Sequence, residues 1–91
     1  MMDAKNEQEL DSNLAMFSKL LEQIAKTIVN IPEKVRVRVE QAEDKSSLLI
    51  VVDPQDLGKI IGKNGQTVKS IRALIYALKP QEQDIIVDVS T

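Results

Sequence analysis

The sequence predicts an α+β fold in a single domain, and three observations support this prediction. Apolar residues recur at steps of three and four in two separate stretches, which is the period of an amphipathic helix. In other stretches they alternate with polar residues at a period of two, as in a strand with one buried face. A chain of 91 residues also has room for only one hydrophobic core. The expected element order is helix, strand, strand, helix, helix, strand.

The first element is a helix that begins near Asn13. Residues 1–12 are polar and aperiodic, so we expect a flexible extension followed by one domain at 13–91. Asp11 or Ser12 is a candidate cap. The helix should end at Pro32, because the residue before a proline is disfavoured in the helical region. Its apolar stripe comprises Leu14, Phe17, Leu21, Ile24, Ile28 and Ile31.

Two strands should follow the helix. Val35, Val37 and Val39 alternate with charged residues, and Leu48 to Val52 is a continuous run of strand formers. Residues 41–47 form the expected polar turn between them. Arg36 and Arg38 are expected on a solvated face of the first strand, or else as an extension of a basic surface.

The second half begins with a helix start at Asp53–Asp56. Asp53 is expected to cap the helix, Pro54 suits its first position, and Asp56 adds a carboxylate to the first turn. Reading the two aspartates as a catalytic pair is the weaker alternative, since neither a histidine nor a third acid lies near them.

A short helix should run to Ile60 or Ile61, and a longer one should begin near Gln66 and stop at Pro80. The longer helix is expected to bury one face, and the final strand should span 85–89 with Ile86 on its other side. The expected buried face comprises Val68, Ile71, Leu74, Ile75 and Leu78.

The composition argues against catalysis and against a metal centre. The chain contains no histidine and no cysteine, which removes the usual general base and the commonest ligands of transition metals. We therefore expect no catalytic residue, no metal and no cofactor. The chain has neither an apolar run long enough to span a membrane nor the character of a signal peptide, so a cytoplasmic protein is expected.

The charge distribution favours a polyanionic partner. The net charge is −2, yet residues 57–80 contain five basic residues and no acidic one, so this stretch carries +5 and the remainder −7. A polyanion responds to the local field rather than to the total charge. The five basic residues are Lys59, Lys63, Lys69, Arg72 and Lys79.

The loop Gly62-Lys63-Asn64-Gly65 lies within this basic stretch, between the two expected helices. Glycine permits positive φ and lets another backbone approach closely. The first N–H groups of the following helix are unpaired and carry partial positive charge, which suits a phosphate. A hairpin around Asn64-Gly65 is the alternative, but the pattern that follows runs at three and four rather than two. A nucleotide-binding P-loop fails on spacing, and Asn64 stands where Ser or Thr would hold magnesium.

The element order αββααβ, with Ile61-Gly62-Lys63-Asn64-Gly65-Gln66-Thr67-Val68 in its centre, resembles the KH domain, whose signature is Ile-Gly-x-x-Gly-x-x-Ile. Val68 replaces the last isoleucine of that signature. The order is similar to the type II, or prokaryotic, KH arrangement. The resemblance implies a three-stranded mixed sheet with three helices packed on one face. Overall length and residues 57–77 resemble the small single-KH bacterial proteins called KhpA.

The resemblance also implies a function: binding of single-stranded RNA, because the Gly-x-x-Gly loop of KH domains clamps about four nucleotides. Carried onto this sequence, Gly62, Lys63, Asn64 and Gly65 contact the RNA backbone. The floor or walls of the groove would come from Leu57, Gly58, Ile60 and Ile61, with Lys59, Lys69 and Arg72 adding charge. The sequence leaves open which of Ile60 and Ile61 faces the bases.

One such module should bind RNA weakly, in the micromolar range, so a second module would raise its avidity. The longer helix carries a stripe of mostly small side chains, Gln66, Ser70, Ala73 and Ala77, which we expect to form a dimer interface. KhpA-like proteins are expected to act as RNA chaperones or post-transcriptional regulators tied to cell elongation. The resemblance also implies that they pair with themselves or with the larger KH protein called Jag or EloR. The alternative is a protein adaptor for which RNA contact is secondary.

Overall fold

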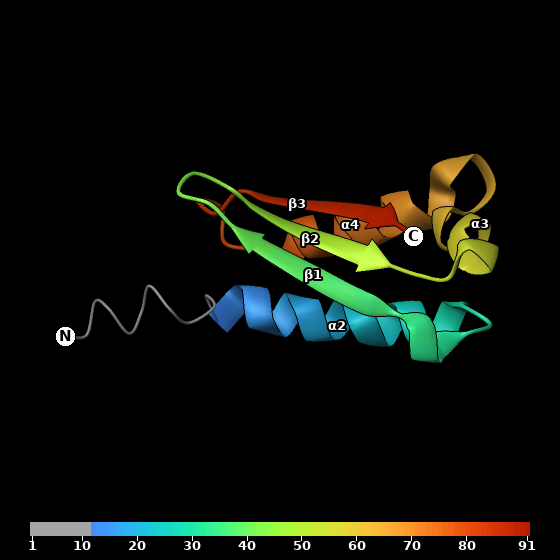
Figure 1. Ribbon diagram of the computed structural model, residues 1–91. Coiled ribbons are helices and arrows are strands. Elements are labelled where there is room, and N and C mark those ends of the chain that lie inside the picture. The colour runs from blue at the N-terminus through green and yellow to red at the C-terminus, as the bar shows by residue number, and fades with distance from the viewer. Residues whose placement is uncertain (1–11) are drawn as a thin grey trace.

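The computed structural model describes residues 12–91 of the protein (Figure 1). The expected extension therefore lies outside the described residues, apart from Ser12. The predicted element order is confirmed: α2 (Ser12–Ile28), β1 (Arg36–Gln41), β2 (Ser46–Val51), α3 (Leu57–Ile61), α4 (Gln66–Leu78) and β3 (Ile85–Ser90). Short 3₁₀ turns at Pro32–Lys34, Pro54–Asp56 and Lys63–Gly65 connect some of these elements.

The three strands form a mixed sheet in the order β1-β2-β3. β1 pairs antiparallel with β2, and β2 pairs parallel with β3. Because parallel neighbours need a crossover connection, the chain leaves the sheet after β2, forms α3 and α4, and returns as β3. Leu49 lies at the centre of the sheet, opposite Arg38 on one side and Asp88 on the other.

The hydrophobic core lies on one face of this sheet. Burial alternates along β2, with Ser46, Leu48 and Ile50 facing inward, as expected from the two-residue period of a strand. The helix α2 packs along β1 and β2, α4 packs along β3, and α3 lies at the end of the sheet (Figure 1). All three pack on the buried face, as the type II KH arrangement implies. The core comprises Leu14, Phe17, Leu21, Ala25, Val29, Val35, Leu48, Ile50, Val52, Ile60, Ile71, Ile75, Ile85 and Val87.

Helix α2 ends earlier than the sequence predicts. Its last residue is Ile28, so the prediction that it continues to Pro32 is wrong. The backbone N–H groups of Asn30 and Ile31 donate to the two carboxylate oxygens of Asp56, at 3.0 and 2.9 Å. Because these N–H groups are held by a distant side chain, the chain leaves the helix before the proline is reached. The helix begins at Ser12, which is thus its first residue rather than its cap, and Asp11 lies outside the described residues.

This pairing also corrects the role expected for Asp56. Asp53 caps as predicted, accepting the Gln55 N–H at 2.9 Å. The Asp56 side chain makes no capping hydrogen bond to its own helix and is fully buried. It instead joins the connection after α2 to the start of α3, which holds α3 against the rest of the fold.

The turn between β1 and β2 is shorter at both ends than the expected 41–47, and the buried face of α4 is narrower than expected. The turn between β1 and β2 is only residues 42–45, closed by a hydrogen bond from Ala42 N to Lys45 O at 3.0 Å. Leu74 and Leu78 are 42% and 53% exposed, so α4 does not bury them. Helix α4 packs along the edge strand β3, and a helix at a sheet edge has a neighbour on only part of its circumference.

Candidate nucleic-acid interface

The connection between α3 and α4 is a tight turn with three residues at positive φ. Gly62 has φ 79° and ψ 171°, Asn64 has φ 56° and ψ 27°, and Gly65 has φ 73° and ψ 14°. The Gly62 N–H closes α3 on Gly58 O at 2.8 Å, and the Gly65 N–H bonds Gly62 O at 3.1 Å. The turn is neither a hairpin nor a P-loop. It is the glycine-bracketed bend between two helices that the sequence predicts.

Glycine is required at position 62 for two independent reasons. An extended ψ at positive φ is a region that essentially only glycine occupies. A Cβ at this position would also lie 2.7 Å from Cβ and 2.8 Å from the backbone N of Thr67. Gly65 differs, since a Cβ there would meet only Cε of Lys69, at 3.8 Å. The close approach of Gly62 to Thr67 thus sets how tightly the loop folds over the start of α4.

The loop presents backbone N–H groups to solvent. Within residues 12–91, the N–H groups of Lys63 and Asn64 have no acceptor in the protein, and both residues are exposed. No carboxylate of the described chain caps the loop. Unpaired N–H groups next to the positive end of a helix dipole form a site suited to an anion.

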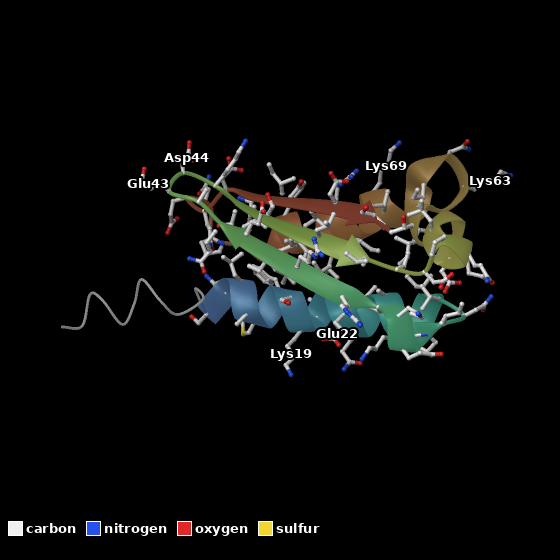
Figure 2. The ribbon with its side chains drawn as sticks, in the orientation of Figure 1. Lys19, Glu22, Glu43, Asp44, Lys63 and Lys69 are labelled. Carbon is white, nitrogen blue, oxygen red and sulfur yellow. The ribbon has the colours of Figure 1, made fainter. Side chains whose placement is uncertain are left out.

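Positive charge surrounds the loop, and negative charge gathers at the other end of the molecule. Lys63 and Lys69 project from the end formed by α3 and the start of α4, whereas Glu43 and Asp44 lie at the opposite end (Figure 2). The described part of the chain extends 46 Å along its longest axis. None of Lys59, Lys63 and Lys69 forms an ion pair in the part of the chain that the structure describes. Their charges are therefore available to an external anion, while the acidic end should repel one.

The structure separates the two isoleucines that the sequence could not. Ile60 is fully buried in the core, whereas Ile61 is 37% exposed. Ile60 supports α3 from beneath and has no surface for a contact, so Ile61 is the isoleucine that a ligand can reach. Leu57 is half-buried and packs against the core, and Gly58 is exposed on α3.

Arg72 occupies a different position from the lysines. Its Nε donates to Val87 O at 2.8 Å, and its Nη2 lies 3.4 Å from Oδ1 of Asp88. The same Oδ1 accepts the Val89 N–H at 3.1 Å. Arg72 therefore binds the edge strand β3, where unpaired backbone groups would otherwise face solvent. The Arg72 side chain remains 35% exposed, so its contact with RNA stays a prediction. Arg36 and Arg38 are exposed on β1.

The stripe of small residues on α4 is exposed, as a dimer interface would require. Gln66, Ser70, Ala73 and Ala77 all face solvent, and Ser70 Oγ donates to Gln66 O at 3.0 Å. Larger apolar side chains flank the stripe, and the sequence pattern had assigned two of them, Leu74 and Leu78, to the buried face of the helix. They are Leu74, Leu78 and Tyr76, and near the end of α4 a hollow of about 350 Å³ is lined by Asn13, Met16, Phe17, Leu20 and Leu78.

Two negative findings apply to residues 12–91. No group of three or more carboxylates is placed to hold a metal ion. None of the described helices combines the length and apolar character needed to cross a bilayer.

Comparison with known proteins decides the family. The family model described as KhpA/KhpB, KH domain matches residues 18–89, which include the loop and all six elements in whole or in part. The chain belongs to the KhpA/KhpB KH-domain family. It has a type II KH fold, as its topology and its signature both indicate.

Individual relatives agree with this assignment. The RNA-binding protein KhpA of Thermotoga maritima is 41% identical over 71 residues, which cover 78% of this chain and 95% of the relative. The RNA-binding protein KhpA of Clostridium acetobutylicum is 41% identical over 69 residues, covering 76% and 92%. The protein of that name in Oceanobacillus iheyensis is 40% identical over 60 residues, covering 66% and 80%.

Proposed function

We propose that this protein binds single-stranded RNA through the loop at residues 62–65 and that it does so without catalysis. The observation that carries the proposal is the pair of unpaired N–H groups at Lys63 and Asn64, beside exposed lysines. Family membership supports it as well, because the curated relatives are named RNA-binding proteins.

In this proposal the loop binds the RNA backbone and α3 contacts the neighbouring nucleotides. Gly62 and Gly65 let a phosphate approach the N–H groups of Lys63 and Asn64 closely. Lys59 and Lys69 flank the loop and neutralise adjacent phosphates. With about two or three phosphate contacts, log K should fall with log salt concentration at a slope of roughly −1.4 to −2.1. Aromatic stacking has a minor part, since Phe17 is buried and Tyr76 is on α4.

The direct test exchanges Lys63 and Asn64 for aspartate. Lys63→Asp with Asn64→Asp places two carboxylates where a phosphate must lie and lowers the local charge by three. Affinity for a fluorescent single-stranded RNA 10-mer, measured by anisotropy, should fall at least tenfold. A matched control, Lys19→Asp with Gln23→Asp, makes the same charge change on exposed positions of α2.

The control variant should lose no more than about twofold in affinity, because exposed charges beyond a Debye length are largely screened. Equal losses in the two variants would show that only net charge matters and would defeat the loop as the site. An unchanged affinity in the loop variant would defeat it as well.

We further propose that the protein acts as a dimer, or with a second KH protein of the Jag or EloR type, through α4. The exposed small residues allow two helices to approach closely, and Leu74, Leu78 and Tyr76 offer apolar area to bury. Two linked modules would convert weak single contacts into useful avidity. The cellular role that fits such a module is that of a cytoplasmic KhpA-like RNA chaperone or post-transcriptional regulator linked to cell elongation.

A second candidate function, that of a protein adaptor, is favoured by the same exposed apolar surface. The two functions are separated by comparing Ala77→Arg, which places a bulky charge on the α4 face, with the loop variant. If the protein is mainly an adaptor, this substitution abolishes its cellular activity and the loop variant does not. If RNA binding is central, the loop variant abolishes the activity. Complementation of a deletion strain with each variant separates the two.

A further inference from the structure

The dipeptide Asn64-Gly65 combines two features that make an asparagine chemically reactive. Glycine has no side chain to shield its backbone nitrogen, so this nitrogen can attack the side-chain amide of the residue before it. Asn64 is also exposed, so solvent reaches its amide. Asn64 is the one asparagine of the sequence that precedes a glycine; the others are Asn6, Asn13 and Asn30, which precede Glu7, Leu14 and Ile31. Loss of ammonia from an asparagine is therefore expected first at position 64.

The reaction converts the asparagine into an acidic residue, with water as its co-reactant. The Gly65 nitrogen gives its proton to solvent and forms a bond to Cγ of Asn64, while the side-chain nitrogen takes up a proton and leaves as ammonia. Water then opens the resulting cyclic imide at one of the two bonds between the Gly65 nitrogen and a carbonyl carbon. Opening at Cγ gives aspartate, and opening at the backbone carbon gives isoaspartate, in which the main chain runs through the former side chain. Either product carries a carboxylate at position 64.

The closed loop holds Asn64 in a geometry that cannot react. The Gly65 N–H donates to Gly62 O at 3.1 Å, so the attacking nitrogen is engaged in a hydrogen bond. The imide ring also requires the Gly65 nitrogen and Cβ of Asn64 on the same side of the bond between Cα and the carbonyl carbon of Asn64. At ψ 27° the nitrogen lies nearly on the opposite side from Cβ. The reaction therefore requires a local opening of the loop that breaks this hydrogen bond and turns ψ.

We infer that Asn64 is a deamidation site controlled by the conformation of the loop, and that its conversion inactivates RNA binding. Asn64 supplies one of the two N–H groups of the loop that lack an acceptor within the described chain, so a new carboxylate there repels the phosphate that these groups would bind. RNA in turn protects the site, because a phosphate held by the loop stabilises its closed form. The effects on and of RNA rest on the proposed function, whereas the reactivity of Asn64 and its protection by the closed loop do not.

Peptide mass spectrometry of the full chain follows the reaction, because each converted asparagine gains the mass difference between a hydroxyl and an amino group. In mildly alkaline guanidinium chloride, Asn64 should convert at least about tenfold faster than Asn13 and Asn30, whose following residues shield the nitrogen with a side chain. In the folded chain the conversion of Asn64 should be at least about fivefold slower than in denaturant, since the loop must first open. Gly65→Ala is the matched control and should suppress the conversion in denaturant, because its Cβ shields the attacking nitrogen.

The RNA-dependent half of the inference uses the fluorescent RNA 10-mer. At an RNA concentration of about ten times Kd, the conversion of Asn64 in the folded chain should slow about tenfold, since only the unbound chain opens. The converted chain carries an additional negative charge and can be separated from the unmodified chain by anion exchange. Its affinity for the RNA should be at least about fivefold lower, because a carboxylate then lies beside the phosphate.

The outcomes separate this inference from the function on which its second half rests. Conversion of Asn64 in denaturant that is no faster than that of Asn13 would remove the site, and equal rates in the folded and denatured chain would show that the loop gives no protection; either result would overturn the inference. Bound RNA that leaves the rate unchanged, or a converted chain that binds RNA as well as the unmodified one, would overturn it too. The proposed function would still stand in these cases if the aspartate loop variant loses binding. If the unmodified chain does not bind RNA, the proposed function fails, and the comparison of folded and denatured chain still decides whether the loop protects Asn64.

Discussion

Substitution of the two loop glycines by alanine should have unequal effects, although both residues have nearly the same φ. At Gly65, φ 73° and ψ 14° are the ordinary left-handed conformation, which costs an alanine about 1 kcal/mol, and the new Cβ has space. At Gly62, ψ is 171°, a region in which a side chain costs about 1–3 kcal/mol before any contact is counted.

Contact with Thr67 increases the cost at Gly62. The new Cβ would lie 2.7 Å from Cβ and 2.8 Å from the backbone N of Thr67, and backbone cannot move away as a flexible side chain can. We therefore expect Gly62→Ala to destabilise the domain by about 3 kcal/mol and Gly65→Ala by about 1 kcal/mol. With about 4–8 °C per kcal/mol for a domain of this size, the melting temperatures should differ by roughly 8–16 °C.

The assay is urea and thermal unfolding of both variants, together with the double variant Gly62→Ala, Thr67→Ala. Removing Thr67 Oγ1 relieves only the side-chain part of the clash, so the double variant should recover part of the loss and not all of it. A Gly62→Ala variant that is as stable as Gly65→Ala would refute the reasoning, because the contact with Thr67 would then have no energetic consequence.

Three further predictions concern residues that the structure reassigns. Asp56→Ala should destabilise the domain by about 2 kcal/mol in urea unfolding, because the N–H groups of Asn30 and Ile31 lose their acceptor, and Asp56→Asn should destabilise it about half as much. An Asp56→Ala variant as stable as the unmodified chain would show that these two hydrogen bonds do not hold α3 in place. Arg72→Ala should cost about 1 kcal/mol of stability through the lost bond to Val87 O, with little from the exposed ion pair. Lys69→Ala should leave stability unchanged and weaken RNA binding more than Arg72→Ala does. The reverse order of the two effects on RNA binding would show that Arg72 is the stronger RNA contact. Leu74→Lys with Leu78→Lys should change the free energy of unfolding by no more than about 1 kcal/mol, since both side chains are exposed. The same double variant should shift any dimer toward monomer in analytical ultracentrifugation. A large loss of stability would show that the two side chains are part of the core.

Local chemistry accounts for the parts of the fold that the sequence predicted well. Period-two alternation in β1 and β3, the aspartate and proline before α3, and the glycine-bracketed turn are each recognisable within a few residues. Their order, together with the glycine motif, carries the resemblance to KH domains, and that resemblance implied the type II topology. The bend at the loop was recognised in the same way, because two glycines with lysine and asparagine between them interrupt two helical patterns.

Errors occurred where a distant segment decides the outcome. Helix α2 stops at Ile28 because Asp56, more than twenty residues later, takes the N–H groups of Asn30 and Ile31. A capping pattern in the sequence suggests a carboxylate near a helix start but does not show which N–H groups it accepts. The same limit hid the role of Arg72, whose partner Val87 is on a strand that follows α4.

The sequence by itself determined which segments become helices and strands, and where a glycine-bracketed turn joins two helices, because these depend on backbone preferences and on the spacing of apolar residues along a few turns. Only the tertiary structure decided that Ile60 is buried and Ile61 exposed, and that Leu74 and Leu78 face solvent. The period of a pattern shows that one side of a helix is apolar, but the extent of burial depends on how much of that side the neighbouring elements cover.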